Sequence, residues 1–161
     1  MTLKEMEKRL KALEDVEEVK QLQYAYIYAL NARKFDDIIE MFSDDMREDG
    51  FPKGESRAGK KEVEKVWRTM DETSRDRPYL HTTIVAQPMV SVDGDNAKGY
   101  FLWLGRINDP RKFVSQEDGD DVIMALPRLG RYDMEYKKEK GKWKMSYLKF
   151  TLPWPEVKKL K

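Results

Sequence analysis

His81, Tyr26 and Asn31 are the side chains of this sequence that first suggest chemistry. His81 is the single histidine, and imidazole is the only side chain whose ordinary pKa lies between about 5 and 8. It could be a general base, or a hydrogen-bonded or surface histidine. Tyr26 could donate a hydrogen bond to a substrate oxygen, or be a core tyrosine whose hydroxyl is already bonded. Asn31 could hold His81 or a substrate carbonyl, or end its helix.

The composition excludes several other kinds of site. There is no cysteine and one histidine, which excludes thiolate nucleophiles, disulfides and cysteine- or polyhistidine-based metal sites. The acidic run at 118–121 lacks the spacing and final glutamate of a calcium-binding loop. We therefore expect no metal and no organic cofactor.

The charge balance also bears on partners and location. The chain has 31 basic and 30 acidic residues, which argues against a nucleic-acid or membrane binder. No apolar run approaches the roughly 20 residues of a membrane span, and the start, MTLKEMEKRL, lacks the apolar core of a signal peptide. We expect a cytoplasmic protein with neither nucleic acid nor membrane as partner.

The candidate residues of the first half lie in predicted helices. Apolar residues recur at helical spacing along 15–31, and we expect Tyr26 and Asn31 to point together toward the core. A short helix follows at 36–42. Residues 2–14 form a predicted N-terminal helical arm that docks on the body or on a neighbouring subunit. The segment 42–56 is predicted as a turn with one short strand at most, and 59–70 as a third helix.

The second half changes to the period of two that is typical of strands. Four strands are predicted, at 80–92, 97–107, 131–137 and 142–152, with hairpin turns at Asp93-Gly94-Asp95 and Lys140-Gly141. The strand 97–107 is apolar on both faces, so one face is expected to meet a helix or another subunit. Residues 108–130 are predicted as an irregular acidic insertion, and 152–161 as a tail. Helices followed by antiparallel strands indicate a single α+β domain over 1–161.

Four stretches carry a resemblance to a known family: VEEVKQLQYAYIYALNARKFDDIIEMFSDD, GKKEV, QPMVSVDGDNAKGYFLWL and GRYDMEYKKEKGKWKMSYLKFT. Together they cover most of residues 15–151. In order and spacing they resemble the SnoaL-like branch of the nuclear transport factor 2-like superfamily, which includes scytalone dehydratase, bile acid 7α-dehydratase and polyketide cyclases. The resemblance implies a cone-shaped α+β barrel, in which a curved, mostly antiparallel sheet wraps around N-terminal helices and leaves a deep pocket.

The resemblance also implies which residues do chemistry. Dehydratase members use a tyrosine and an aspartate on the first long helix and a histidine on the first long strand. Tyr26 matches the tyrosine, Asn31 stands at the aspartate position, and Thr83 stands at the histidine position. His81 lies two residues earlier, on the same face of the strand as Thr83. Because asparagine supplies no charge, the usual Asp–His pair is absent or altered.

These assignments define the functional hypotheses. His81 would remove a proton next to a carbonyl, while Tyr26 and Asn31 bind the developing oxyanion or the departing hydroxyl. Trp103, Tyr132 and Tyr136 either line the cavity beside Thr83 or are plain core, and Arg106 pairs with a substrate carboxylate or with a surface acid.

The chain is thus expected to be a cofactor-independent lyase or isomerase acting on an apolar cyclic, polyketide- or steroid-like molecule. The alternatives are a non-catalytic binding protein for an apolar ligand, and an accessory subunit resembling a ring-hydroxylating dioxygenase β subunit. The strand at 97–107 and the resemblance both favour a homodimer or homotrimer.

Overall fold

The computed structural model describes residues 1–50, 54–74, 81–107 and 128–152, apart from the side chains at positions 74, 81, 82, 106 and 107. The elements of this described part are the helices α1 (Leu3–Asn31), α2 (Phe35–Glu40) and α3 (Lys60–Ser74), and the strands β1 (Phe42–Asp49), β2 (Ser56–Ala58), β3 (His81–Asp93), β4 (Asn96–Ile107), β5 (Arg128–Glu139) and β6 (Lys142–Thr151).

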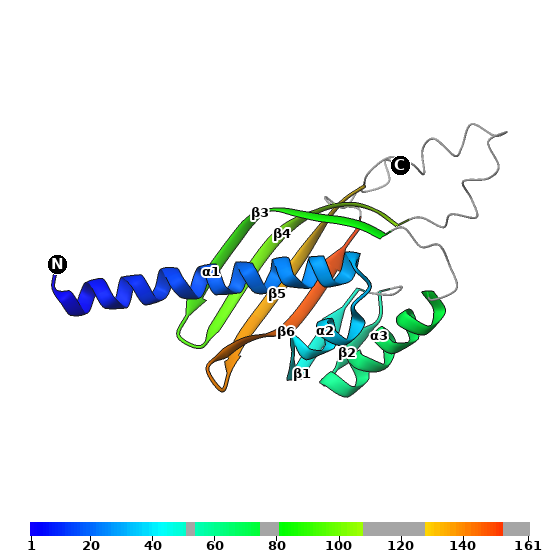
Figure 1. Cartoon of the computed structure of the whole chain (residues 1–161), viewed down its shortest axis with the longest axis horizontal. Helices are drawn as coiled ribbons and strands as arrows, with labels where there is room; N and C mark the ends of the chain where they lie inside the picture. The colour runs from blue at the N-terminus through cyan, green and yellow to red at the C-terminus, as the bar shows by residue number, and fades with distance from the viewer. Residues whose placement is uncertain (51–53, 75–80, 108–127, 153–161) are drawn as a thin grey trace, which may run out of the picture.

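The strands of the described residues form one six-stranded sheet in the order β2-β1-β6-β5-β4-β3. All neighbouring strands are antiparallel except β1 and β6, which run parallel. Helix α1 crosses one face of this sheet, while α2 and α3 lie with β1 and β2 near one end (Figure 1). The predicted α+β class, with N-terminal helices on a mostly antiparallel sheet, is confirmed.

Helix α1 joins the predicted arm and the predicted 15–31 helix into one element of 29 residues. A capping box between Thr2 and Glu5 begins it, and Arg33, in the left-handed conformation at φ 59°, follows its end. The first half projects past the sheet (Figure 1), and its apolar residues, including Leu3 and Leu13, are 69% and 68% exposed. Residues 1–14 are exposed and pack on no described element of the body, and docking on a neighbouring subunit, the other predicted alternative, stays a prediction.

The strands β3 to β6 confirm the predicted period of two. In β4, Phe101 and Trp103 are buried, whereas Tyr100 and Leu104 are exposed on the opposite face. The bounds differ from the predictions by one to three residues, and β5 begins within the segment that was predicted to be an insertion. The rest of the predicted insertion, and the predicted tail beyond position 152, lie outside the described residues.

The segment after α2 is more ordered than predicted, since β1 and β2 replace most of the expected turn. Strand β1 lies between β6 and β2 and hydrogen-bonds to both. Its side chains at Phe42, Met46 and Glu48 are buried, while Asp44 and Arg47 are exposed. Phe42 therefore begins a strand and does not end a helix as predicted.

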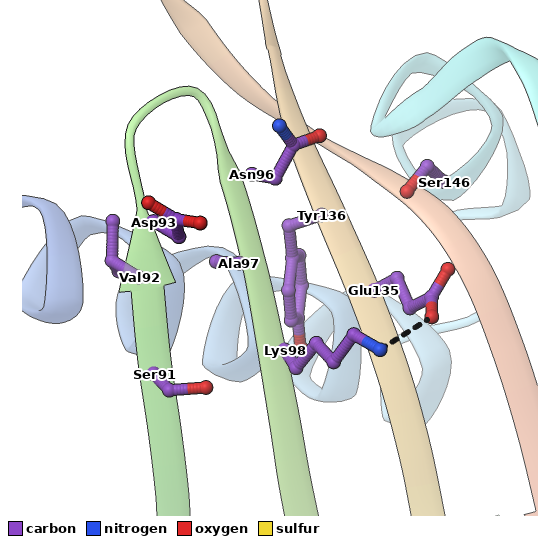
Figure 2. Close-up of a pocket in the computed structure, with 9 residues that line it drawn as sticks. All are labelled: Ser91, Val92, Asp93, Asn96, Ala97, Lys98, Glu135, Tyr136 and Ser146. Atoms are coloured by element: carbon purple, nitrogen blue, oxygen red, sulfur yellow. Dashed lines mark ion pairs between the residues drawn. The ribbon is translucent and has the colours of Figure 1, made fainter.

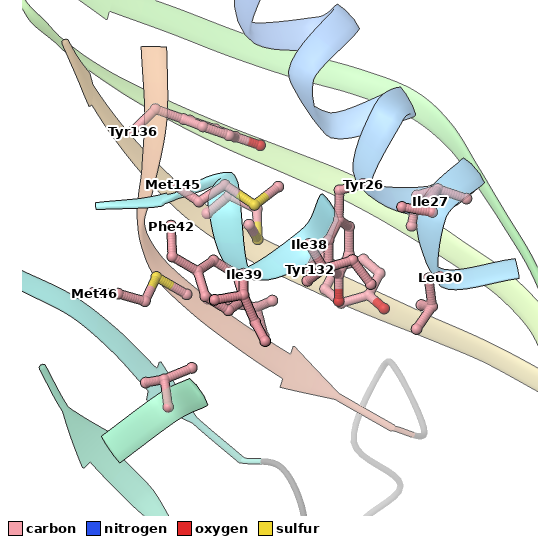
Figure 3. Close-up of a cluster of buried hydrophobic side chains, with 14 of the residues drawn as sticks. Tyr26, Ile27, Leu30, Ile38, Ile39, Phe42, Met46, Tyr132, Tyr136 and Met145 are labelled. Atoms are coloured by element: carbon pink, nitrogen blue, oxygen red, sulfur yellow. The ribbon is translucent and has the colours of Figure 1, made fainter. Parts of the chain in front are cut away.

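The core lies between the helices and the inner face of the sheet (Figure 3). It combines side chains from α1, α2, α3, β1, β4, β5 and β6, and those drawn with labels are Tyr26, Ile27, Leu30, Ile38, Ile39, Phe42, Met46, Tyr132, Tyr136 and Met145. In this view the hydroxyl groups of Tyr26 and Tyr132 lie next to each other, and that of Tyr136 lies apart from them. Polar groups are thus enclosed within an aromatic and aliphatic shell.

Candidate functional site

Tyr26 lies at the centre of the inner aromatic cluster and is 1% exposed. Its ring makes edge-to-face contacts with Trp67 from α3 and Tyr132 from β5, with centroid distances of 6.0 and 6.1 Å. Such pairs add about 0.5–1.5 kcal/mol to the burial of their area. The amphipathic face of α1 and the alternation of β5 place the two phenols together, although 106 residues separate them in the sequence.

The two phenols are held in their neutral form. Burial raises the pKa of Tyr26 well above its usual value and also raises the pKa of Tyr132. A hydrogen-bonding interaction between the hydroxyls raises the pKa of Tyr26 further and lowers that of Tyr132. At any physiological pH the pair therefore supplies hydroxyl donors in an apolar environment.

Glu48 places a carboxyl group in this same region. Its side chain is 0% exposed, and neither carboxyl oxygen has a hydrogen-bond partner among the described residues. Burial raises its pKa to about 7, although the Arg57 guanidinium, with Nη1 at 3.7 Å from Oε2, acts to lower it. Negative charge on Glu48 raises the pKa of both Tyr26 and Tyr132, so the carboxyl acts electrostatically on both phenols.

Trp67 completes the group. An interaction of its indole N–H with the Glu48 carboxyl lowers the pKa of that carboxyl. Within the described residues, however, Nε1 has no partner that meets the distance and angle of a hydrogen bond. Its ring also packs against Phe42, with a centroid distance of 5.9 Å. We call Tyr26, Tyr132, Glu48 and Trp67 the inner polar cluster. Helices α1 and α3 and strands β1 and β5 each contribute one member.

Asn31 is not a core residue, and the prediction that it faces inward beside Tyr26 is wrong. A step of five residues turns a helical side chain by about 140°, which carries Asn31 to an exposed position. Its amide Nδ2 donates to the Thr83 carbonyl at 2.8 Å, and its Oδ1 accepts from the Thr83 N–H at 2.9 Å. These two bonds fix the end of α1 to β3, which is the edge strand of the sheet.

Thr83 and Trp103 continue this connection into the core. Both side chains are buried, and Trp103 Nε1 donates to the Thr83 hydroxyl at 3.2 Å. The Trp103 ring contacts Phe150 at 5.2 Å, and Phe150 contacts Tyr132 at 4.9 Å. Aromatic contacts through Phe150 therefore link β4 to the inner polar cluster, and the hydrogen bond from Trp103 to Thr83 joins β3 to them.

Tyr136 is bonded apart from that cluster. Its hydroxyl donates to Gln23 Oε1 at 2.7 Å, and burial raises its pKa well above the usual value. The Gln23 Nε2 has no hydrogen-bond partner among the residues described. Tyr136 is thus a core tyrosine with its hydroxyl satisfied.

A second buried carboxyl, Asp15, lies on the same helix, closer to the N-terminus. Lys138 Nζ donates to Asp15 Oδ1 at 2.5 Å, Trp143 Nε1 donates to the same oxygen at 3.3 Å, and Lys11 Nζ lies at 3.3 Å. Burial raises the pKa of Asp15, but the hydrogen bonds from Lys138, Lys11 and Trp143 together bring it below the usual value. Asp15 is a satisfied, ionised group that ties α1 to β5 and β6.

The side chains of two predicted site residues, His81 and Arg106, lie outside the described part of the chain. Their backbones are placed in the sheet. His81 begins β3 opposite Ile107, two positions before Thr83, and Arg106 of β4 is paired with Thr82.

The cavities bounded by described residues include the following three. One, of about 380 Å³, opens on β3 to β6 where Lys98 and Glu135 form an ion pair at 3.5 Å (Figure 2). A second, of about 370 Å³, is apolar and borders Met89 and Tyr100. The third, of about 290 Å³, lies between α1 and β3, and Tyr24, Tyr28, Asn31 and Thr83 are among its lining residues.

The described residues contain neither a cluster of metal ligands nor a membrane-spanning helix. No group of three or more histidine, cysteine, aspartate or glutamate side chains there is placed to hold a metal ion. No helix of that part is long and apolar enough to span a membrane.

Sequence reasoning missed Glu48 as a site residue. The signal was the alternation of Met46, Arg47, Glu48 and Asp49, which places Met46 and Glu48 on one face of a strand. The density of acidic residues and the glycine that follows favoured a turn instead. Trp67 was predicted to face inward, but the sequence does not indicate which group its indole N–H approaches.

Comparison with known proteins supports the fold. A search of curated proteins gives no match. Among solved structures, a nuclear transport factor 2-like protein of unknown function from Pseudomonas putida is 19% identical and has a TM-score of 0.70, with 92% of this chain and 97% of that one covered. A protein from Novosphingobium aromaticivorans with a cystatin-like fold is 16% identical, with a TM-score of 0.71 and coverages of 97% and 93%.

A third similar structure, a provisionally assigned scytalone dehydratase from Novosphingobium aromaticivorans, is 12% identical, with a TM-score of 0.67 and coverages of 91% and 97%. At these identities the likeness establishes the nuclear transport factor 2-like fold alone. The sequence model of the SnoaL-like domain family matches residues 11–149, which is most of the chain. This protein therefore belongs to the SnoaL-like domain family.

Proposed function

We propose that this chain is a small-molecule lyase or isomerase that needs no cofactor and acts on an apolar cyclic substrate, polyketide- or steroid-like in shape. The observation that carries the proposal is the neutral phenol pair of Tyr26 and Tyr132, enclosed by aromatic rings. Hydroxyl donors in an apolar surround stabilise negative charge that develops on a substrate oxygen. Proteins of similar structure include ones provisionally assigned as a dehydratase and as a ketosteroid isomerase.

In this mechanism His81 takes the proton from the carbon next to a carbonyl group. The electron pair moves onto the carbonyl oxygen, which accepts a hydrogen bond from Tyr26. The enolate then either expels a hydroxyl group as water or is reprotonated at another carbon. General base catalysis of this kind contributes about 10²–10⁴-fold.

Asn31 and the predicted binding residues have supporting roles. The bonds from Asn31 to the Thr83 backbone hold the strand on which His81 lies, and one amide hydrogen remains to donate to a substrate oxygen. Trp103, Tyr132 and Tyr136 form the apolar wall beside Thr83, and Arg106 pairs with a substrate carboxylate.

Turnover of β-hydroxy ketones with two to four fused rings tests the proposal, since the enone product is followed by ultraviolet absorbance. We expect His81→Ala to lower kcat about 10²–10⁴-fold and Tyr26→Phe to lower it about 10²-fold. Tyr28→Phe is the matched control, because Tyr28 lies on the same helix and is exposed. Rates of His81→Ala and Tyr26→Phe equal to those of the control would contradict the mechanism.

The alternative is a non-catalytic binding protein, and one observation supports it. Asn31 carries no charge and its amide is engaged by the backbone of β3, so it cannot raise the basicity of a histidine as an aspartate does. Recovery of a bound ligand unchanged after long incubation would favour binding over catalysis. Co-purification with a larger metal-bearing partner would instead indicate an accessory subunit.

A homodimer or homotrimer is part of the same proposal. The outer face of the sheet exposes apolar side chains that include Ile84, Met89, Tyr100, Leu104 and Leu129. A strip of this kind on a sheet is typical of an interface. Light scattering of the purified chain should give two or three times the monomer mass, and Tyr100→Glu with Leu104→Glu should give the monomer mass.

A further inference from the structure

The first half of α1 carries an apolar stripe that no described element covers. We call residues 3–14 of this helix the arm. Four of its apolar side chains recur at steps of three and four along the helix and are exposed to solvent: Leu3, Met6, Leu10 and Leu13. Single apolar residues on a surface are ordinary, whereas a contiguous set of them marks an interaction site.

The stripe faces away from the sheet of its own chain. Because each residue of a helix is turned by about 100° from the one before, the middle of the stripe lies about 160° around the helix axis from the middle of the side that α1 buries further along. That buried side includes Val19 and Tyr26. The arm also projects past the sheet (Figure 1). The partner of the stripe therefore has to come from outside this chain's sheet.

The spacing of the stripe is that of a coiled coil. Its four members occupy, in turn, the first and fourth positions (a and d) of a seven-residue repeat, which is the pattern of helices that pack side by side. The next two such positions are Glu17 and Lys20, which form an ion pair with each other at 3.2 Å. The apolar repeat thus ends where the helix reaches the body, and a helical partner would pack along the arm alone.

The charges beside the stripe indicate which helix this partner is. Arg9 comes directly before Leu10 (position g), and Glu14 comes directly after Leu13 (position e). Both charged side chains are exposed. When two arms lie parallel and in register, position g of each helix faces position e of the other, so Arg9 and Glu14 meet on both flanks. An antiparallel pair would instead bring the Arg9 side chains of the two copies together.

The mixed charge of the arm's polar side disfavours a membrane as the partner. Helices that lie on membranes carry mainly lysine and arginine on their polar side, whereas the arm interleaves Lys4 and Lys8 with Glu5 and Glu7. An anionic surface is therefore not the complement of this helix, and a second copy of the helix is.

We propose that the arms of two copies of this chain pair as a short parallel coiled coil, with the stripe in the seam and Arg9 of each copy facing Glu14 of the other. This interface is separate from the outer face of the sheet, because the stripe lies on the side of α1 that faces away from the sheet. The arm has two repeats, whereas coiled coils that are recognisable alone have about three to four or more. The arm pair is therefore weak, and it does not hold two chains together at the low concentrations used for light scattering.

Disulfide formation between single introduced cysteines tests the pairing, because the chain has no cysteine of its own. The background is the full chain with Tyr100→Glu and Leu104→Glu, which removes the apolar face of the sheet. Leu13→Cys places a thiol in the seam. Lys8→Cys is the matched control, since it lies on the same exposed arm about 180° from the middle of the stripe.

The readout is the rate of covalent dimer formation in a glutathione buffer, divided by the rate at which each thiol reacts with a small disulfide reagent. At equal chain concentrations we expect Leu13→Cys to dimerise at least about tenfold faster than Lys8→Cys, because pairing raises the local concentration of the two thiols. Circular dichroism should show the same folded body in all variants, since the arm packs on no described element of it.

Charge variants in the Leu13→Cys chain assign the orientation. At low salt, Arg9→Glu should slow dimer formation by about three- to tenfold, because like charges then meet on both flanks. Combining Arg9→Glu with Glu14→Arg should restore the rate to within a factor of about two, because the attractive pairs return with their signs exchanged. Leu10→Glu should lower the rate to that of Lys8→Cys, because it places a charge in the apolar seam.

Three results would overturn the proposal. Equal normalised rates for Leu13→Cys and Lys8→Cys would show that the arms do not pair. A rate of Leu13→Cys that Leu10→Glu leaves unchanged would show that the stripe is not the contact. In a mixture of Leu3→Cys and Leu13→Cys chains, faster linking of position 3 to position 13 than of like positions would show antiparallel pairing. None of these results depends on a pocket, so the proposed function is tested separately.

Discussion

Two buried carboxyl groups lie in different parts of the interior, and each has a cation and a tryptophan close by. Asp15 accepts hydrogen bonds from Lys138 and Trp143 at 2.5 and 3.3 Å. Glu48 has a guanidinium at 3.7 Å from Arg57 and, among the described residues, accepts no hydrogen bond. A carboxylate, a cation and a tryptophan therefore form hydrogen bonds with one another at Asp15. At Glu48 the same three kinds of side chain form none among the described residues.

The difference shows in the protonation of the two groups. The partners of Asp15 outweigh its burial and lower its pKa, whereas burial of Glu48 outweighs its partners and raises its pKa to about 7. Removing one partner of a buried ion pair destabilises a fold, and a buried charge without hydrogen bonds costs free energy. The two carboxyls therefore differ in their surroundings: Asp15 accepts hydrogen bonds from two side chains, whereas Glu48 has a guanidinium at 3.7 Å and no hydrogen bond among the described residues.

The largest expected effect is on stability: replacing each carboxyl by an amide should change the free energy of unfolding in opposite directions. At pH 8, Asp15→Asn should lower the free energy of unfolding by about 3 kcal/mol, because it breaks a buried pair and leaves the Lys138 ammonium uncompensated. Glu48→Gln should raise it by about 1–3 kcal/mol, because it removes a poorly solvated charge. Urea denaturation followed by circular dichroism gives both values.

Glu135→Gln, at a half-buried outer position, is the control for the substitution itself and should change stability by less than about 1 kcal/mol. Destabilisation by Glu48→Gln as large as that by Asp15→Asn would show that both carboxyls are structural, and the distinction between them would be lost.

The pH dependence of stability sharpens the comparison. Glu48 titrates at 4.5 when unfolded and at about 7 when folded, so the folded state holds the proton to higher pH and stability falls as pH rises between these values. The fall amounts to about 3 kcal/mol and is complete above pH 7. It should be absent in Glu48→Gln.

Asp15 should behave in the opposite sense. Its folded pKa lies below 3.8, so its contribution is fully present above about pH 4 and is lost as pH falls through the folded pKa. Thermal unfolding from pH 3 to pH 8 for the two amide variants checks both statements. Identical pH profiles of stability for Glu48→Gln and the unaltered chain would contradict the statement on Glu48.

A smaller effect distinguishes the two tryptophans. Trp143→Phe removes a made hydrogen bond to Asp15 and should cost about 1 kcal/mol. Trp67→Phe removes an N–H that has no hydrogen bond among the described residues, so its effect on stability should be smaller than that of Trp143→Phe. A larger loss for Trp67→Phe would mean that its N–H is bonded within the folded protein.

The elements that could be predicted from the sequence are those in which side-chain periodicity matches burial. Tyr132, Met134 and Tyr136 alternate with Asp133 and Glu135 in β5, and the structure confirms that alternation. Strand β1 could not be recognised, because SDDMRED has little strand propensity. It is held in place by pairing with β2, which follows it in the chain, and with β6, which lies about 100 residues later. Its pairing is a tertiary effect.

The candidate site also has a part that could be predicted from the sequence and a part that could not. Helical spacing was enough to place Tyr26 in the core, but the 140° turn to Asn31 was overlooked. The contact of Tyr26 with Tyr132, and the approach of Glu48 to Trp67, join residues from separate elements. Periodicity predicts which face a residue occupies and gives no information on its partner across the core.

The most direct test is a titration of the Glu48 side-chain carboxyl, followed by carbon NMR of the selectively labelled chain. We predict a pKa of about 7, because burial disfavours the charged form more than the neighbouring guanidinium favours it. A pKa near the ordinary 4.5 would contradict the account that the two buried carboxyls differ in their protonation.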